Sequence, residues 1–224
     1  MPAQRIGSGS VALAQYDLVG SDSRSVVNFP CHAGLAEPGT NAVSRGERVT
    51  VAHMGPPLSV GGNMAADAVG TVGLTADEAK QIGVFIDEHI NEHRAHTMAT
   101  PAYASYVVRP RARPELAADG TTKYFRFSCV GFAIEAYRDA GIDFVVTDEH
   151  RLPTVPLDCL IKAYPAIPLS NWGRLNTRYN WGCDGPGPWP TMLPGYLFHA
   201  LDHFVIGDRA APPYLPQLGD EIFP

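Results

Sequence analysis

A strand-to-helix junction in the middle of the chain constrains the fold more than any other feature of the sequence. Residues 122–127 have the aromatic and polar composition of a strand, and Ser128 directly after them is a residue type typical of a helix N-cap. Apolar residues then recur at helical spacing until Gly141, and glycine commonly follows the last turn of a helix. The pattern predicts a helix that begins at Cys129. Its expected buried face consists of Val130, Ala133, Ala136, Tyr137 and Ala140.

Strands and helices alternate irregularly along the rest of the chain. Thr75 and Glu78 form a capping box ahead of a helix that runs to about Arg94. Alternating or β-branched patterns predict strands at 11–19, 25–36, 47–54, 103–108 and 143–147. Further helical segments are expected at 154–163 and at roughly 191–205. Because no βαβ unit repeats, the pattern favours an α+β fold.

Length and composition predict one globular domain. The chain has 224 residues, of which 45% are hydrophobic and 18% charged, so it can bury a sizeable core. We expect a single domain over residues 1–224, with its core at about 11–165 and an aromatic, proline-rich extension at 166–224.

Charge and hydropathy argue against two classes of partner. The formal net charge is -6, and the basic cluster Arg109, Arg111 and Arg113 is interrupted by prolines, so no nucleic-acid partner is expected. No stretch approaches the roughly 18 apolar residues of a membrane helix, so no integral membrane segment is expected.

The first ten residues lack the pattern of a signal peptide, which predicts a cytoplasmic location. The sequence leaves the oligomeric state open.

Cys129 has the residue type and the position expected of a nucleophile. Backbone N–H groups and the dipole at a helix N-terminus favour a thiolate, which is the nucleophilic form. The same amides can donate to the oxyanion of a tetrahedral intermediate, and Gly131 leaves room for another chain or a substrate. The alternative is a small buried cysteine near a helix cap. Of the other cysteines, Cys31 and Cys159 are expected in the core and Cys183 at the surface.

The residues around Cys129 resemble the nucleophile helix of NlpC-like papain-fold enzymes. There a cysteine, a small residue, glycine and an aromatic residue open an amphipathic helix, as Cys129-Val-Gly-Phe does here. Two earlier segments, Pro30-Cys-His32-Ala-Gly-Leu and Val49-Thr-Val-Ala-His53-Met-Gly-Pro-Pro, resemble the histidine strands of the lecithin–retinol acyltransferase group. That group has a circularly permuted version of the same fold, with the histidine strands first and the cysteine helix last.

The resemblance covers roughly residues 16–165 and implies a permuted papain-like core, with an antiparallel sheet packed against the nucleophile helix. It implies that His32 is the general base for Cys129 and that His53 is the polar residue that orients His32. These roles make physical sense, because a thiol nucleophile needs a base within reach and a third group that fixes the tautomer of the base. The alternative is that both are strand histidines bonded to the backbone.

Two other histidine pairs have a spacing that metal ligands use. His89 and His93 are four residues apart near the end of a helix, and so are His199 and His203. Histidine also suits a helix end for electrostatic reasons, and no third ligand is evident for His199 and His203. We therefore expect no metal and no cofactor, and a metal hydrolase stays a distant alternative.

Together these features predict a cysteine hydrolase or acyltransferase of the peptidase, amidase or acyl-lipid type. It would cleave an amide or ester bond through a cysteinyl thioester on Cys129. A peptide, an isopeptide or an acyl lipid would be its substrate, and the sequence does not choose among them. The alternative is a non-catalytic binding or structural protein that retains the fold.

Overall fold

An antiparallel sheet forms the framework of the chain. The computed structural model describes residues 2–22, 28–39, 41–55, 58–97, 107–165, 169–173, 178 and 181–224. Within these residues the sheet has six strands in the order β1-β8-β3-β4-β6-β7, and all neighbouring strands are antiparallel. The strands are β1 (Ala3–Arg5), β3 (Leu18–Asp22), β4 (Pro30–Ala36), β6 (Arg48–Met54), β7 (Leu58–Ala65) and β8 (Ala68–Gly70).

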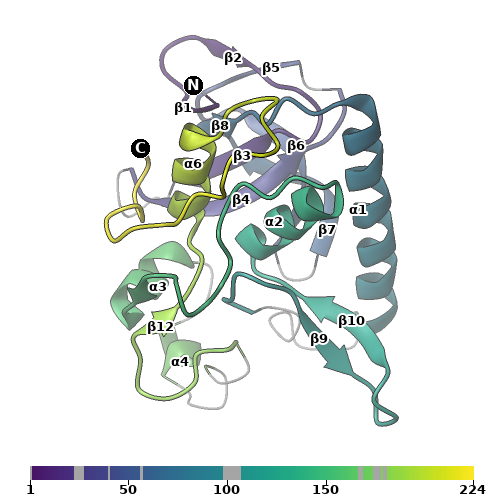
Figure 1. The fold of residues 1–224 in the computed structure, drawn as a ribbon, viewed down its shortest axis with the longest axis vertical. Helices are drawn as coiled ribbons and strands as arrows, with labels where there is room; N and C mark the ends of the chain where they lie inside the picture. Colours follow the sequence, from purple (N-terminus) through teal and green to yellow (C-terminus); the bar gives the residue numbers. More distant parts are fainter. Residues whose placement is uncertain are drawn as a thin grey trace.

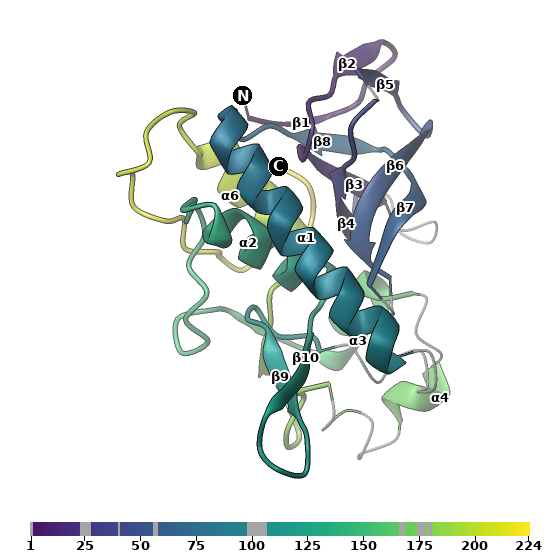
Figure 2. The same ribbon diagram turned by 90° about the vertical axis from the view of Figure 1, so that its right-hand side faces the viewer.

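Three helices lie on one side of this sheet (Figures 1 and 2). They are α1 (Ala76–Thr97), α2 (Cys129–Asp139) and α6 (Pro194–His203). The shorter helices are α3 (Leu157–Ala163) and α4 (Leu169–Trp172). Two-stranded ladders join β2 (Ser10–Ala12) to β5 (Ala42–Ser44), β9 (Arg113–Leu116) to β10 (Thr122–Arg126), and β11 (Thr154–Val155) to β12 (Trp189–Pro190). The expected α+β class is therefore confirmed.

Two sets of apolar residues bury the sheet from its two faces. On the face covered by the helices, Leu18 and Leu35 belong to a larger core that also contains residues of α1, α2 and α6. On the other face, Val19 and Val51 belong to a smaller core, together with Val43 of the β2–β5 ladder. Since successive side chains of a strand point to opposite faces, adjacent residues such as Leu18 and Val19 join different cores.

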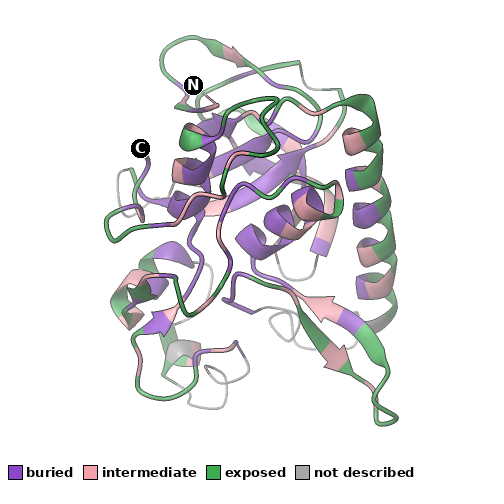
Figure 3. Ribbon diagram, viewed as in Figure 1, coloured by how far each residue is buried: buried purple, intermediate pink, exposed green. Residues whose placement is uncertain are grey.

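The helix predicted from Ser128 to Gly141 is confirmed, and its ends show why the prediction succeeded. Ser128 is the N-cap, and its hydroxyl accepts a hydrogen bond of 2.8 Å from the backbone N–H of Gly131. At the other end, Gly141 has φ +79°, and the N–H of Ile142 donates to the carbonyl of Tyr137, as in a Schellman motif. Most of α2 is buried (Figure 3).

The apolar run at 11–19 is not one strand, which corrects the prediction. β2 ends at Ala12 and β3 begins at Leu18, because the chain turns between them. Tyr16 has a positive φ of 61° in this turn, and the carboxylate of Asp17 accepts a hydrogen bond of 2.8 Å from the N–H of Ala14. A turn made by side-chain capping inside an apolar run leaves little trace in the hydrophobic pattern.

Other predicted elements differ in extent. The predicted strand at 143–147 is wrong, since it reduces to one parallel bridge between Val145 and Tyr214. The predicted helix at 154–163 divides into β11 and α3, with Pro156 as the N-cap between them. The strand predicted at 25–36 is described from Pro30 on, and residues 25–27 of it lie outside the described part of the chain. Residues 103–106 of the strand predicted at 103–108 also lie outside it.

The C-terminal segment contributes directly to the larger core. Trp181 and Trp189 are buried there, and α6 adds Tyr196 and Phe198. The aromatic residues of this segment therefore cover the sheet and the helices instead of forming an appendage. Within the described part of the chain, no helix combines the length and apolar character needed to cross a membrane.

Candidate active site

The two predicted site histidines lie on neighbouring antiparallel strands. His32 is on β4 and His53 on β6, and the strands pair in a register that sets Leu35 opposite Ala52. α2 packs against both strands, so the helix that begins at Cys129 and the two histidine strands form one unit. The predicted placement of both histidines on paired strands is therefore confirmed.

A hydrogen bond of 2.6 Å joins the two imidazoles. It links His32 Nε2 to His53 Nδ1, and the ring planes are nearly perpendicular, at 85°. One nitrogen must donate and the other accept. If His32 donates through Nε2, its Nδ1 keeps a lone pair, and that atom has no hydrogen-bond partner among the described residues. This tautomer gives His32 a nitrogen that can take up a proton.

Both imidazoles are held in the neutral form. Burial, and secondarily the neighbouring His53, lowers the pKa of His32 to about 3. Burial also lowers the pKa of His53 below its ordinary value of 6.5. A neutral imidazole is the form that a general base needs before reaction, although a base with so low a pKa holds the proton weakly.

Two glycines make the space that the ring of His53 occupies. A Cβ atom at Gly55 would lie 2.6 Å from Cε1 of His53, and one at Gly62 would overlap its Nε2. Larger residues at either position would displace the imidazole from its bond to His32. Sequence reasoning did not single out these glycines, although Gly55 lies only two residues after His53.

Cys129 occupies the first position of α2 and is completely buried, with 0% of its surface exposed. It belongs to the larger core, together with Ala33 and Leu35 of β4. The imidazoles project from the other face of the sheet, since Gly34 lies against both His53 and Val51 of the smaller core. No hydrogen bond joins Cys129 to His32 or His53, all three of which are described. The structure thus pairs the two histidines with each other, and the contact between base and nucleophile stays a prediction.

The first residues of β4 relate the two parts of the candidate site, which are the histidine pair and Cys129. β4 is irregular here, because Ser21 pairs with His32 whereas Asp22 pairs with Pro30, which leaves Cys31 as an extra residue. Burial raises the pKa of the Cys31 thiol to about 12, and the charge of Cys129 adds to this rise. Cys129 is therefore close enough to β4 to act electrostatically on the residue next to His32.

The remaining thiols are poorly suited to be nucleophiles. All four cysteines are free. Burial raises the pKa of Cys159 to about 11 and that of Cys183 to about 12. The expectation that Cys183 is exposed is wrong, because it is 3% exposed and lies in the larger core. Cys31 and Cys159 are only partly buried.

The other two histidine pairs bond to backbone groups or to a neighbouring carboxylate. His93 is fully buried, with Nε2 donating to the carbonyl of Phe125 over 2.6 Å and Nδ1 accepting from the N–H of Leu58 over 3.4 Å. His89 bonds to Glu92, and His203 bonds to the backbone carbonyl of His199. Among the described residues, no three histidine, cysteine, aspartate or glutamate side chains gather in a way that would hold a metal ion.

Comparison of the chain with protein-family models, with curated proteins and with solved structures finds no match. The candidate site therefore rests on the residues and geometry described above.

Proposed function

We propose that the chain is a thiol-dependent hydrolase or acyltransferase with a permuted papain-like core. The observation that carries this proposal is the joint placement of the site elements. Cys129 opens a helix that packs on one face of the two strands, and the other face of these strands bears the hydrogen-bonded His32–His53 pair. The order along the chain, with the histidine strands before the cysteine helix, agrees with the resemblance to the lecithin–retinol acyltransferase group.

In this mechanism His32 takes the thiol proton through Nδ1, because Nε2 is bonded to His53. The sulfur of Cys129 then forms a bond to the carbonyl carbon of an amide or ester. In this mechanism the N–H of Val130, in the first turn of α2, donates to the oxyanion, because first-turn amides have no partner within the helix. The C–N or C–O bond breaks, and the amine or alcohol leaves with the proton from His32. Water or another acceptor resolves the thioester and restores the thiol. A peptide, an isopeptide or an acyl lipid fits this scheme.

A non-catalytic binding or structural role is the second candidate. The burial of Cys129 in the larger core favours it, as does the bonding of His32 to His53 and not to the sulfur. The enzyme must bring Cys129 Sγ within about 3–4 Å of His32 Nδ1 during its cycle. A protein without activity has no need of that approach.

Brief labelling with iodoacetamide at pH 6, followed by peptide mapping, separates these candidates. The enzyme is expected to be alkylated at Cys129 well before the other three cysteines, whose raised pKa values keep them protonated. A Cys129→Ser variant is the control and should take up almost no label. Uniform labelling of all four cysteines, or a native protein that stays unlabelled at Cys129, supports the non-catalytic role.

A further inference from the structure

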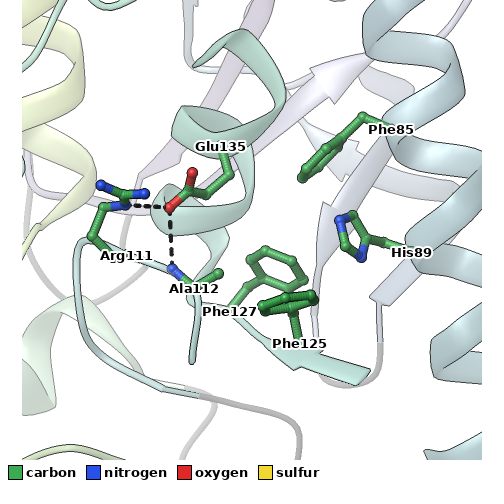
Figure 4. Close-up of a pocket in the computed structure, with 7 residues that line it drawn as sticks. All are labelled: Phe85, His89, Arg111, Ala112, Phe125, Phe127 and Glu135. Atoms are coloured by element: carbon green, nitrogen blue, oxygen red, sulfur yellow. Dashed lines mark hydrogen bonds and ion pairs between the residues drawn. The ribbon is translucent and has the colours of Figure 1, made fainter. Parts of the chain in front are cut away.

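A pocket away from the His32–His53 pair opens between α1, α2 and the β9–β10 hairpin (Figure 4). Its volume is about 220 Å³. The residues that line it come from α1, from β10 and its end, from the segment before β9, and from α2. They are Phe85, His89, Arg111, Ala112, Phe125, Phe127 and Glu135.

Four of the seven lining residues of the pocket carry rings. The ring of His89 lies 4.4 Å from that of Phe85, 5.6 Å from Phe125 and 5.2 Å from Phe127, measured between centroids. All three contacts are edge-to-face. Such a wall offers both ring edges and ring faces, so a further aromatic ring finds favourable partners in it.

The volume of the pocket suits a ligand with a single ring. An apolar protein cavity of about 150 Å³ accepts benzene, so 220 Å³ holds a benzene ring with a small substituent. Pockets for larger, drug-sized molecules begin at about 300 Å³. The space is therefore too small for an extended ligand and large enough for a substituted monocycle.

His89 brings a hydrogen-bond acceptor to the lining of this pocket. His89 Nδ1 lies 3.0 Å from the carboxylate of Glu92, which can only accept, so a neutral His89 carries its proton on Nδ1. Its Nε2 is then an acceptor, and it has no hydrogen-bond partner among the described residues. A ligand with an O–H or N–H group can supply the missing donor.

The carboxylate in the pocket is already neutralised. Glu135 accepts hydrogen bonds from Arg111 Nε over 2.6 Å and from the N–H of Ala112 over 3.3 Å. Arg138 lies 3.6 Å from its other oxygen. A cationic guest would have to compete with both arginines, so the pocket favours a neutral molecule.

We propose that this pocket binds a small, neutral, monocyclic aromatic molecule that carries one hydrogen-bond donor, of which phenol is the simplest. The ring of the ligand packs among Phe85, Phe125 and Phe127, and its donor bonds to His89 Nε2. This site is independent of the thiol chemistry proposed for Cys129.

Titration of the full chain with phenol at pH 8, followed by protein NMR, tests this site. Phenol is expected to bind saturably and to shift the signals of Ala112 and the pocket rings. Benzene should bind about fivefold more weakly, the factor that one ordinary hydrogen bond supplies. In His89→Phe, which keeps a ring and removes the acceptor, phenol and benzene should bind equally.

A blocking variant and a matched control complete the experiment. Ala112→Leu fills the pocket and should abolish saturable phenol binding. Ala118→Leu makes the same change at an exposed position in the turn between β9 and β10 and should leave binding unchanged. The proposal is overturned if phenol binding survives Ala112→Leu, if no signal near the pocket shifts, or if tetramethylammonium binds there more tightly than phenol. Should Ala112→Leu fail to fold, the comparison of phenol with benzene in His89→Phe decides the question.

Discussion

His93 is buried and the His32–His53 pair is partly buried, and burial lowers the pKa of all three imidazoles, yet they differ in what their ring nitrogens bind. Both nitrogens of His93 bond to the backbone, so this residue ties α1 to β7 and to β10. His32 and His53 bond to each other, and His32 Nδ1 has no partner among the described residues. A histidine whose two nitrogens are satisfied by backbone groups holds a fold together, whereas one with an unpaired nitrogen retains the capacity for proton transfer.

Replacing His93 should have the largest effect on stability. His93→Ala leaves the N–H of Leu58 and the carbonyl of Phe125 without their partners in the core, so we expect a loss of about 3 kcal/mol in the free energy of unfolding. Urea denaturation measures this change. His150→Ala, at an exposed histidine, is the control and should change stability by less than about 0.5 kcal/mol. Equal losses of stability in His93→Ala and His150→Ala would contradict the structural role given to His93.

A smaller loss is expected when the space around His53 is filled. In Gly62→Ala the new methyl group overlaps His53 Nε2, so either the strands shift or the ring leaves its bond to His32. We expect a cost of about 2 kcal/mol, measured by the same denaturation. Gly9→Ala serves as the matched control, because its new Cβ meets nothing within 4 Å. An unchanged His32–His53 bond in a stable Gly62→Ala protein would contradict the packing described here.

The smallest effect is a dependence of stability on pH. The pKa of His32 is about 3 in the folded chain, against 6.5 in the unfolded chain. Between these values the unfolded chain binds more protons, so stability falls as the pH falls from about 6.5 toward 3. His32 should account for about 1 kcal/mol between pH 7.5 and pH 5.5. His32→Gln, which keeps a hydrogen-bonding side chain without this titration, should reduce the slope, and an unchanged slope would mean that His32 is not held neutral.

The parts of the fold that the sequence predicts are those set by local chemistry. Helix α2 could be placed because Ser128 and Gly141 mark its ends. The strand predicted at 143–147 is wrong, because its pairing depends on Tyr214, which lies about 70 residues further along the chain. The turn around Tyr16 was also missed, because a positive φ at a tyrosine has no sequence signal.

The same limit applies to the candidate site. Alternation along β4 and β6 sufficed to place His32 and His53 on a common face. Which face that is, and whether Cys129 shares it, depends on how the helices and the β2–β5 ladder cover the sheet. That outcome is set by packing between distant segments, so the contact between sulfur and imidazole could not be derived from spacing alone.

The dependence of Cys129 alkylation on pH tests the central claim most directly. Iodoacetamide rates for the wild type, His32→Ala and His53→Ala require no known substrate. If His32 is the base, His32→Ala should abolish turnover and move the titration of Cys129 toward a free thiol's value of roughly 8.5. His53→Ala should have a smaller effect, and His53→Gln should recover part of it, because glutamine can still hydrogen-bond to His32. A larger shift in His53→Ala than in His32→Ala would reverse the two roles. No shift in either variant would contradict the pairing of Cys129 with this histidine pair and favour a protein without thiol catalysis.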